Sequence, residues 1–383
     1  MEHQEILLRK EGLDPSMEFL LILSCARTTL DSDLLTSLTK LTRQITDWDY
    51  VIRFAVKHGV LLFLLHNVNL TVPTFLAQTT ITGVRRRYAS RNRSLLTKFR
   101  DVTSLFAANG IKAISYKGPI LTGIVYKTQQ LHISGDLDFL VHPRDYDRVK
   151  TFLLTQGYVL SMDCGYKYHL WHPIKQVDLD LHRALVPRWY RFPFSFDHAW
   201  ERAMLLAMPC GGFVPTFCLE DLVIVLCLDL VKDIAQPWNF RLIKITDIAE
   251  LVKYTERINW QVLTNRVKSI GLSRVTHFGL LLADRVYGVT LPPEVRQNME
   301  AHAWLLRGLV TLAMRMMLDE KSSPHMIFPK FLQEVRTIVV LQDDFKNQLF
   351  VVALYLIKPV RLGLKYLFAA VAKFVSCNLL LRG

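Results

Sequence analysis

Two short acidic runs carry the side chains in this sequence that could do chemistry. Residues 133–141 read Ile-Ser-Gly-Asp-Leu-Asp-Phe-Leu-Val, and residues 177–182 read Val-Asp-Leu-Asp-Leu-His. In each run, one apolar residue separates two aspartates; the four are Asp136, Asp138, Asp178 and Asp180. Side chains two apart on a β-strand lie on the same face, so each run predicts a strand with paired carboxylates.

Paired carboxylates on a buried strand repel each other and lose solvation unless a cation neutralises them. If the two strands are neighbours, three or four carboxylates meet at one point. Such oxygen ligands suit a hard divalent ion, Mg²⁺ or Mn²⁺, whereas zinc prefers cysteine and histidine. The arrangement fits two-metal chemistry on a phosphate best. Gly135, directly before the first pair, lets a ligand approach the backbone closely.

The residues around these runs resemble those of a known superfamily. Gly-Asp-Leu-Asp-Phe from Gly135, with Lys117-Gly118 upstream and an Asp-Leu-His strand downstream, is similar to the polymerase-beta-type nucleotidyltransferases. Within that superfamily the chain most resembles a bacterial group labelled uncharacterised nucleotidyltransferase family proteins, over most of its length. Asp47-Trp48 and His58-Gly59 match an upstream helical segment of that group.

The resemblance implies roles for individual aspartates. Asp136 and Asp138 match the first two metal-binding carboxylates of the superfamily, and Asp180 matches the third. Asp178 lies on the same predicted face as Asp180 and is a second candidate ligand.

Lys117-Gly118 matches the glycine turn whose backbone amides hold the triphosphate in the superfamily. Here Pro119 follows, which suits the first turn of a helix but removes one amide donor. Relatives tend to have an arginine shortly before Gly-Asp, where this chain has Gln129-Gln-Leu-His132. We therefore expect either weak nucleotide binding or the use of His132 or Lys127 in the missing role.

Other candidate binding residues lie near the acidic strands or on a later helix. His182 shares the predicted face of Asp180, which favours orienting a carboxylate or binding the leaving phosphate over metal ligation. His169 and His172 lie beside the acidic strands. Arg241 and Asp247 fall on an otherwise apolar predicted helix, which in the resembling group faces the cleft. Packing against other helices explains these two residues equally well.

The resemblance implies a metal-dependent transfer of an NMP from an NTP to an acceptor hydroxyl or phosphate, with Asp180 as the base. A small molecule, or a peptide or glycan intermediate, is favoured as acceptor because no aromatic and basic single-strand-binding module is visible. The basic run from Arg85 to Arg100 keeps an RNA or tRNA acceptor open. A degenerate nucleotidyltransferase fold serving as a scaffold is the alternative from a different class.

The elements that would position these residues can be read from periodicity. Strands are expected at 111–116, 136–141, 157–161, 166–172 and 176–183, with helices at 119–127 and 144–156 between them. This order predicts an α+β fold, in which a small mixed sheet with helices on one side is flanked by N- and C-terminal helical regions. The expected divisions are residues 1–105, 106–205, 206–345 and 346–383.

Composition indicates a soluble enzyme with polyanionic partners. Of 383 residues, 51% are apolar and the net charge is +13, which favours nucleotides, nucleic acid or an anionic membrane surface. The cysteines show no metal-ligand spacing and the charged start is no signal peptide, so a reducing, cytoplasmic location is expected. The apolar, lysine-punctuated segment 346–383 predicts a helix packed on the core or, alternatively, a peripheral membrane anchor.

Overall fold

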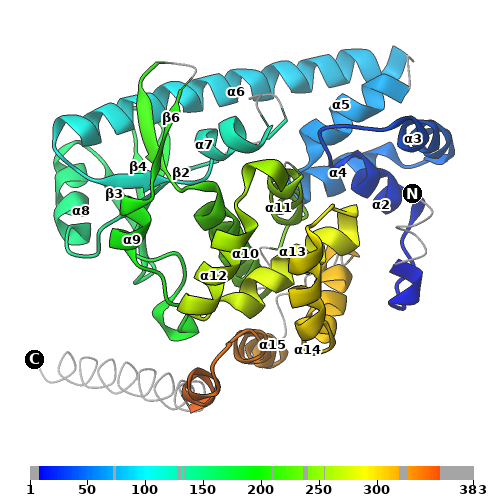
Figure 1. Cartoon of the computed structure of the whole chain (residues 1–383). Helices are drawn as coiled ribbons and strands as arrows, with labels where there is room; N and C mark the ends of the chain where they lie inside the picture. The colour runs from blue at the N-terminus through cyan, green and yellow to red at the C-terminus, as the bar shows by residue number, and fades with distance from the viewer. Residues whose placement is uncertain are drawn as a thin grey trace, which may run out of the picture.

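The protein is described here by a computed structural model covering residues 8–71, 75–126, 131–132, 135–208, 211–235, 240–253, 255–318 and 327–353. A five-stranded mixed sheet and a two-stranded sheet lie among many helices (Figure 1). The predicted α+β fold class is confirmed.

The N-terminal region is helical, as periodicity predicts. Its helices are α2 (Met17–Cys25), α3 (Ser32–Gln44), α4 (Trp48–Lys57), α5 (Leu61–Thr71) and α6 (Phe75–Ala108). Asp47 caps α4, because its side chain accepts a hydrogen bond of 2.8 Å from the Tyr50 amide. After α4 the chain turns sharply at Gly59, where φ is +72°.

The five-stranded sheet carries both acidic runs on adjacent strands. Its strands are β1 (Ala113–Ser115), β2 (Leu137–Val141), β3 (Val159–Asp163), β4 (Lys167–His172) and β5 (Val177–His182). Their order is β1-β2-β5-β4-β3, and the β2–β5 pair is parallel while the others are antiparallel. The mixed sheet is confirmed, and each strand lies within two residues of its predicted bounds.

One face of this sheet packs on two helices. The 34-residue helix α6 runs along the sheet (Figure 1), and the rings of its Phe99 and Phe106 lie 5.6 and 5.1 Å from that of Phe139 in β2. On the same face, Tyr146 of α8 (Tyr146–Thr155) stacks on Tyr168 of β4 at 4.3 Å. The opposite face bears the carboxylates and is also covered, by C-terminal helices across a cavity, so the expectation of helices on one side only is incomplete.

Two local features differ from the sequence prediction. The helix expected after Gly118 is a short α7 (Pro119–Leu121) continued by a π-helix, η1 (Thr122–Tyr126), and Lys127 lies outside the described residues. A hairpin of β6 (Met204–Ala207) and β7 (Phe213–Thr216) was not predicted, and the boundary expected at 205/206 falls inside β6. The domain division itself stays a prediction.

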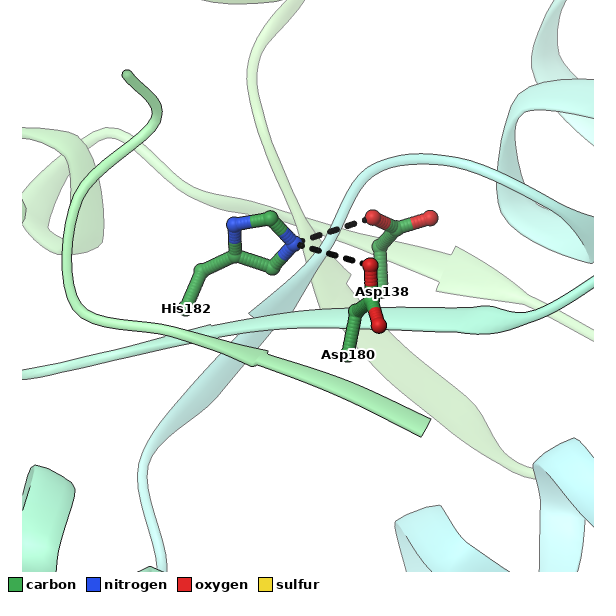
Figure 2. Close-up of side chains that lie close together, drawn as sticks. All are labelled: Asp138, Asp180 and His182. Carbon is green, nitrogen blue, oxygen red and sulfur yellow. Dashed lines mark hydrogen bonds and ion pairs between the residues drawn. The ribbon is translucent and has the colours of Figure 1, made fainter. Parts of the chain in front are cut away.

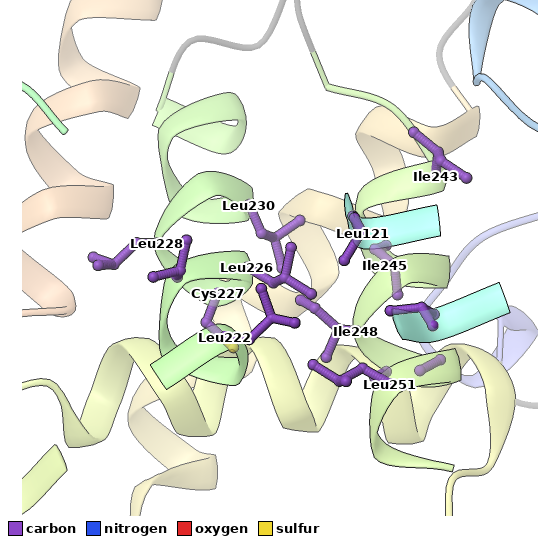
Figure 3. Close-up of a cluster of buried hydrophobic side chains, with 14 of the residues drawn as sticks. Leu121, Leu222, Leu226, Cys227, Leu228, Leu230, Ile243, Ile245, Ile248 and Leu251 are labelled. Carbon is purple, nitrogen blue, oxygen red and sulfur yellow. The ribbon is translucent and has the colours of Figure 1, made fainter. Parts of the chain in front are cut away.

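The remaining elements are mostly helices. They are the 3-10 helix η2 (Arg188–Tyr190), α9 (Phe196–Glu201), α10 (Leu219–Ala235), α11 (Ile243–Val252), the 3-10 helix η4 (Thr255–Arg257), α12 (Trp260–Ile270), α13 (Ser273–Tyr287), α14 (Pro293–Leu318) and α15 (Ile327–Val340). Leucine and isoleucine side chains of α10 and α11 interdigitate in a buried cluster (Figure 3). A Cβ at Gly279 of α13 would lie 2.4 Å from Cys227 Sγ of α10, so glycine permits their close packing.

The C-terminal segment 346–383 is described only in part. Residues 345–353 are helical, Val351 is fully buried, and the Arg191 guanidinium lies 4.4 Å from the Phe350 ring centre. Phe345, Leu349, Phe350 and Val352 are nevertheless exposed, so packing on the core and a peripheral membrane anchor both stay open. Residues 354–383 lie outside the described residues. Among the described helices, none combines the length and apolarity needed to cross a membrane.

Candidate active site

The two acidic strands bring one aspartate from each run into direct opposition. Asp138 in β2 and Asp180 in β5 are register partners on adjacent parallel strands, and their residues are only 3% and 1% exposed. Because side chains at matched positions of neighbouring strands lie on one face, the carboxylates sit side by side (Figure 2). The sequence predicts that the carboxylates meet if the two acidic strands are neighbours, and the strands are neighbours.

His182, two residues after Asp180 on β5, completes a compact group. Its Nε2 lies 3.0 Å from Asp138 Oδ1 and 3.9 Å from Asp180 Oδ2 (Figure 2). Burial lowers the pKa of this imidazole, so it is neutral near pH 7. Asp138, Asp180 and His182 each offer a ligand atom within 4.8 Å of the others, which is close enough to hold one metal ion.

Asp136 and Asp178, the outer aspartates of each pair, are more exposed to solvent than Asp138 and Asp180. Asp136 is partly exposed and Asp178 is exposed, and both line the cavity above Asp138 and Asp180. Repulsion by Asp138, with burial, raises the pKa of Asp136 to about 6. A cation bound between these carboxylates would remove that repulsion, so the donor set fits a divalent ion.

Lysine side chains partly neutralise the inner carboxylates, and a histidine also contacts one of them. Lys117 Nζ lies 3.5 Å from Asp138 Oδ1, and Lys167 Nζ lies 2.5 Å from Asp180 Oδ2. His169, the partner of Asp180 in β4, contacts the other Asp180 oxygen through Nδ1.

These contacts set the charge state of the inner carboxylates. Burial alone would raise the pKa of Asp138, but Lys117 and the His182 hydrogen bond outweigh burial and lower it. The pKa of Asp180 is likewise lowered against burial, first by His169. Both are therefore ionised at neutral pH.

The aspartates lie in a cavity of about 870 Å³ between the sheet and the C-terminal helices. Its lining is dominated by charge. The basic residues are Arg91, Lys117, Lys167, Lys232, Arg241 and Lys244, and the acidic ones are Asp136, Asp138, Asp178, Asp180, Asp229, Asp233 and Asp247. A cavity of this composition suits a small, highly charged ligand accompanied by cations.

A cluster of lysines around Asp229 forms the far wall of this cavity. Lys117 Nζ lies 3.0 Å and Lys232 Nζ 2.6 Å from Asp229 Oδ1, while Lys244 contacts Oδ2. Asp229 and Lys232 lie on α10, and Lys244 lies on α11. Sequence analysis missed this group, although charges inside the apolar run 222–230 and directly after it were a signal for it.

Arg241 and Asp247 both line the cavity. Asp247 lies on α11, whereas Arg241 precedes the helix, so its predicted helical position is wrong. Tyr126 donates a hydrogen bond to Asp247, and His132 Nε2 lies 3.5 Å from the same carboxylate. His132 is thus engaged with Asp247.

The glycine turn lies at the cavity edge. Gly118 adopts φ +57° and ψ −130°, a conformation open to glycine, and Pro119 begins α7. Gly135 also lines the cavity, and a Cβ there would lie 4.0 Å from an Arg91 guanidinium nitrogen. Arg91 of α6 therefore lies beside Gly135.

His172, the last of the candidate histidines, does not line the cavity. His172 of β4 is on the opposite face from His169 and packs against the ring of Tyr158 at 4.9 Å. The structure brings Asp136, Asp138, Asp178, Asp180, Lys117, Gly118, Gly135 and Arg241 to one cavity, with His182 directly beneath it.

A mixed sheet with facing carboxylates on parallel strands, closed by helices, defines a nucleotidyltransferase-type protein. A family model described as "Uncharacterised nucleotidyltransferase" matches residues 44–288. The chain belongs to this family, and the resemblance identified from the motifs is confirmed. The matched region runs from the end of α3 to the end of α13 and includes the whole cavity. No curated protein matches the chain.

Proposed function

We propose that this protein is a Mg²⁺- or Mn²⁺-dependent nucleotidyltransferase that moves an NMP from an NTP to a small-molecule, peptide or glycan-pathway acceptor. Family membership supports nucleotidyl transfer in general. The observation that carries the finer proposal is the direct opposition of buried Asp138 and Asp180 beside a large, charged cavity.

Asp136, Asp138 and Asp180 would hold the metal, with Asp178 as a further oxygen ligand at the rim. When bound, a divalent ion supplies charge stabilisation for the triphosphate and for the attacking oxygen. His182 holds the Asp138 carboxylate in place through Nε2 and, being neutral, adds no competing positive charge.

In the proposed reaction an acceptor oxygen forms a bond to the α-phosphorus of the NTP. The bond from that phosphorus to the oxygen bridging the α- and β-phosphates breaks, and pyrophosphate leaves. Asp180 takes the acceptor proton, while Lys167 and His169 orient its carboxylate. Arg241 lies where it can contact the nucleotide or the acceptor.

The lining of the cavity supports a small acceptor. Among the described residues that line the cavity, Tyr166 is the one Phe, Tyr or Trp, and stacking of successive bases needs several such rings. An RNA acceptor stays a lesser alternative because Arg86, Arg87 and Arg93 are exposed on α6, the helix that delivers Arg91 to the cavity.

A transfer assay tests the proposal. Purified protein, Mg²⁺ and each α-labelled NTP are incubated with a metabolite extract, total protein or total RNA. We expect label in a small molecule, peptide or glycan precursor, and none with Asp138→Asn. Label confined to RNA and lost on charge reversal of Arg85, Arg86 and Arg87 would replace the acceptor assignment with RNA.

A binding or scaffold function is the second candidate. Lys117 and Lys167 already neutralise the inner carboxylates, and Pro119 removes an amide from the glycine turn. A scaffold would bind no NTP with or without Mg²⁺. Peripheral membrane contact through residues 346–383 belongs to this candidate, and its test is co-sedimentation with anionic vesicles before and after deletion of residues 354–383.

A further inference from the structure

The lysine cluster on Asp229 has more positive charge than its own carboxylate can balance. Lys117, Lys232 and Lys244 all contact Asp229, and their side chains are only 13–18% exposed. Two further carboxylates lie near the cluster: Asp138 Oδ1 is 3.5 Å from Lys117 Nζ, and Asp233 Oδ2 is 3.9 Å from Lys244 Nζ. Burial raises the pKa of Asp233. The pKa of Lys232 is raised despite burial, because of its acidic neighbours, so this amine is charged.

Like charges held this close inside a protein repel each other, and a bound anion would relieve that repulsion. Every member of the cluster lines the cavity, so a ligand there can reach the amines. An ammonium group has several N–H donors, and one carboxylate cannot accept them all. The cluster therefore has binding capacity directed at an anion in the cavity.

The position of the cluster identifies the part of the ligand that it would bind. Lys117 contacts both Asp229 and Asp138, so the cluster lies directly beside the paired carboxylates where the α-phosphorus would react. In an NTP, the anionic group attached to that phosphorus is the pyrophosphate portion, which consists of the β- and γ-phosphates. The glycine turn has lost an amide donor at Pro119, so another source of phosphate ligands is needed.

We propose that Lys117, Lys232 and Lys244, organised by Asp229, form the binding site for the β- and γ-phosphates. The phosphate chain is then held mainly by side chains of α10 and α11 rather than by the amides of the glycine turn. Asp229 keeps the three amines together when the site is empty. This assignment rests on the proposed nucleotidyl transfer and names the side chains that recognise its phosphate donor.

Calorimetric titration of the full chain with inorganic tripolyphosphate in EDTA tests the site without metal, base or acceptor. We expect Lys232→Gln and Lys244→Gln each to weaken binding by about tenfold, the loss of one charge-assisted contact. Each variant leaves two lysines on Asp229, so this buried carboxylate keeps charged partners. Lys253→Gln is the matched control. Lys253 directly follows α11, the helix that carries Lys244, but it contacts Thr28, Thr29 and Glu250 and does not line the cavity.

Lysine labelling of the wild-type protein gives a second readout that no folding defect can affect. Tripolyphosphate should protect Lys117, Lys232 and Lys244 from an amine-reactive reagent and leave Lys253 unprotected. Equal affinity of wild type and both variants, or no protection, would overturn the assignment, as would equally tight binding of inorganic phosphate. Lysine-dependent tripolyphosphate binding without any transfer product would sink the proposed function and leave this site standing.

Discussion

Asp136 and Asp138 are two residues apart, but their carboxylates have different surroundings. Asp138 is bonded by Lys117 and His182, and its pKa is lowered. Asp136 feels mainly the repulsion of Asp138, and its pKa is raised. The inner carboxylate is thus part of a bonded network, whereas the outer one is held at an energetic cost that a cation would offset.

Replacing these aspartates should separate activity from stability. We expect Asp136→Asn and Asp138→Asn each to reduce nucleotidyl transfer by roughly a thousandfold, because each removes a charged ligand from the proposed metal site. In EDTA, Asp136→Asn should be neutral or stabilising, since it removes repulsion. Asp138→Asn should cost about 1–3 kcal/mol, since Lys117 and His182 lose a charged partner.

Transfer assays and urea unfolding of both variants measure this difference. A destabilised Asp136→Asn would show that its carboxylate is stabilised by contacts rather than strained by repulsion. Full transfer by either variant would remove that residue from the proposed catalytic set.

At the scale of elements, the turn between β1 and α7 depends on one glycine. Gly118→Ala forces a side chain into φ +57° and ψ −130°, which should cost about 1–3 kcal/mol. The turn also sets the direction of Lys117, so tripolyphosphate binding should weaken with it.

Gly110→Ala is the control for this prediction. Gly110 also has positive φ, at +63°, but lies between α6 and β1 and does not line the cavity. The Gly110→Ala variant should lose stability and keep its affinity for tripolyphosphate. If thermal melting and calorimetry find both variants equally impaired in binding, the turn has no specific role in the site.

A second element-scale feature joins the N-terminal helices to α11. His58, after α4, is buried, and its Nδ1 accepts a hydrogen bond of 3.2 Å from the Leu242 amide. Burial, with the charges of Lys57 and Arg241, lowers the pKa of His58 to about 3. The neutral ring thereby fixes the chain just before α11, where Arg241 and Lys244 enter the cavity.

This lowered pKa predicts an acid-sensitive junction. The unfolded chain takes up a proton at His58 near pH 6.5, whereas the folded chain does not until about pH 3. The stabilisation is therefore complete above pH 6.5 and is lost as the pH falls towards 3. Between pH 6.5 and 5 the loss should be about 2 kcal/mol.

His58→Asn keeps an acceptor near the Nδ1 position but cannot titrate. Urea unfolding from pH 5 to 7 should show a flatter dependence of the free energy of unfolding for this variant than for wild type. Parallel curves for the two proteins would mean that the pKa of His58 is the same in the folded and unfolded chains.

At the scale of the whole molecule, the cavity proposed to hold the ligand lies between two parts of the chain that are far apart in sequence. Strands β2 and β5 supply the carboxylates, and α10 and α11 supply Asp229 and its lysines. Lys117 joins the two parts through Asp138 and Asp229. A ligand that contacts both parts should stabilise the molecule as a unit.

We expect an NTP with Mg²⁺ to raise the melting temperature more than the NTP or Mg²⁺ alone. At a ligand concentration a hundred times Kd, the stabilisation should be about 2.7 kcal/mol. EDTA or Asp138→Asn should remove the metal-dependent part. A thermal-shift series with four NTPs measures this, and no shift under any condition would favour the scaffold alternative.

The sequence alone was sufficient to predict the strands, the paired aspartates and the family, because each is indicated by a local pattern of residues. An Asp-Leu-Asp run between apolar residues has a strand's period, and Asp47-Trp48 has the form of a capped helix start. Such patterns depend on neighbours within a few positions, and the structure agrees with them.

Only the tertiary structure decided which side chains share the cavity. Asp138 and Asp180 meet because β5 pairs directly with β2, although β3 and β4 lie between them in sequence. Lys117 meets Asp229 across 112 positions of the chain because α10 faces the sheet across the cavity. Local periodicity shows that Asp229, Lys232 and Lys244 are charges on apolar helices, but contact between distant segments depends on how helices pack against the sheet, and no local pattern encodes that packing.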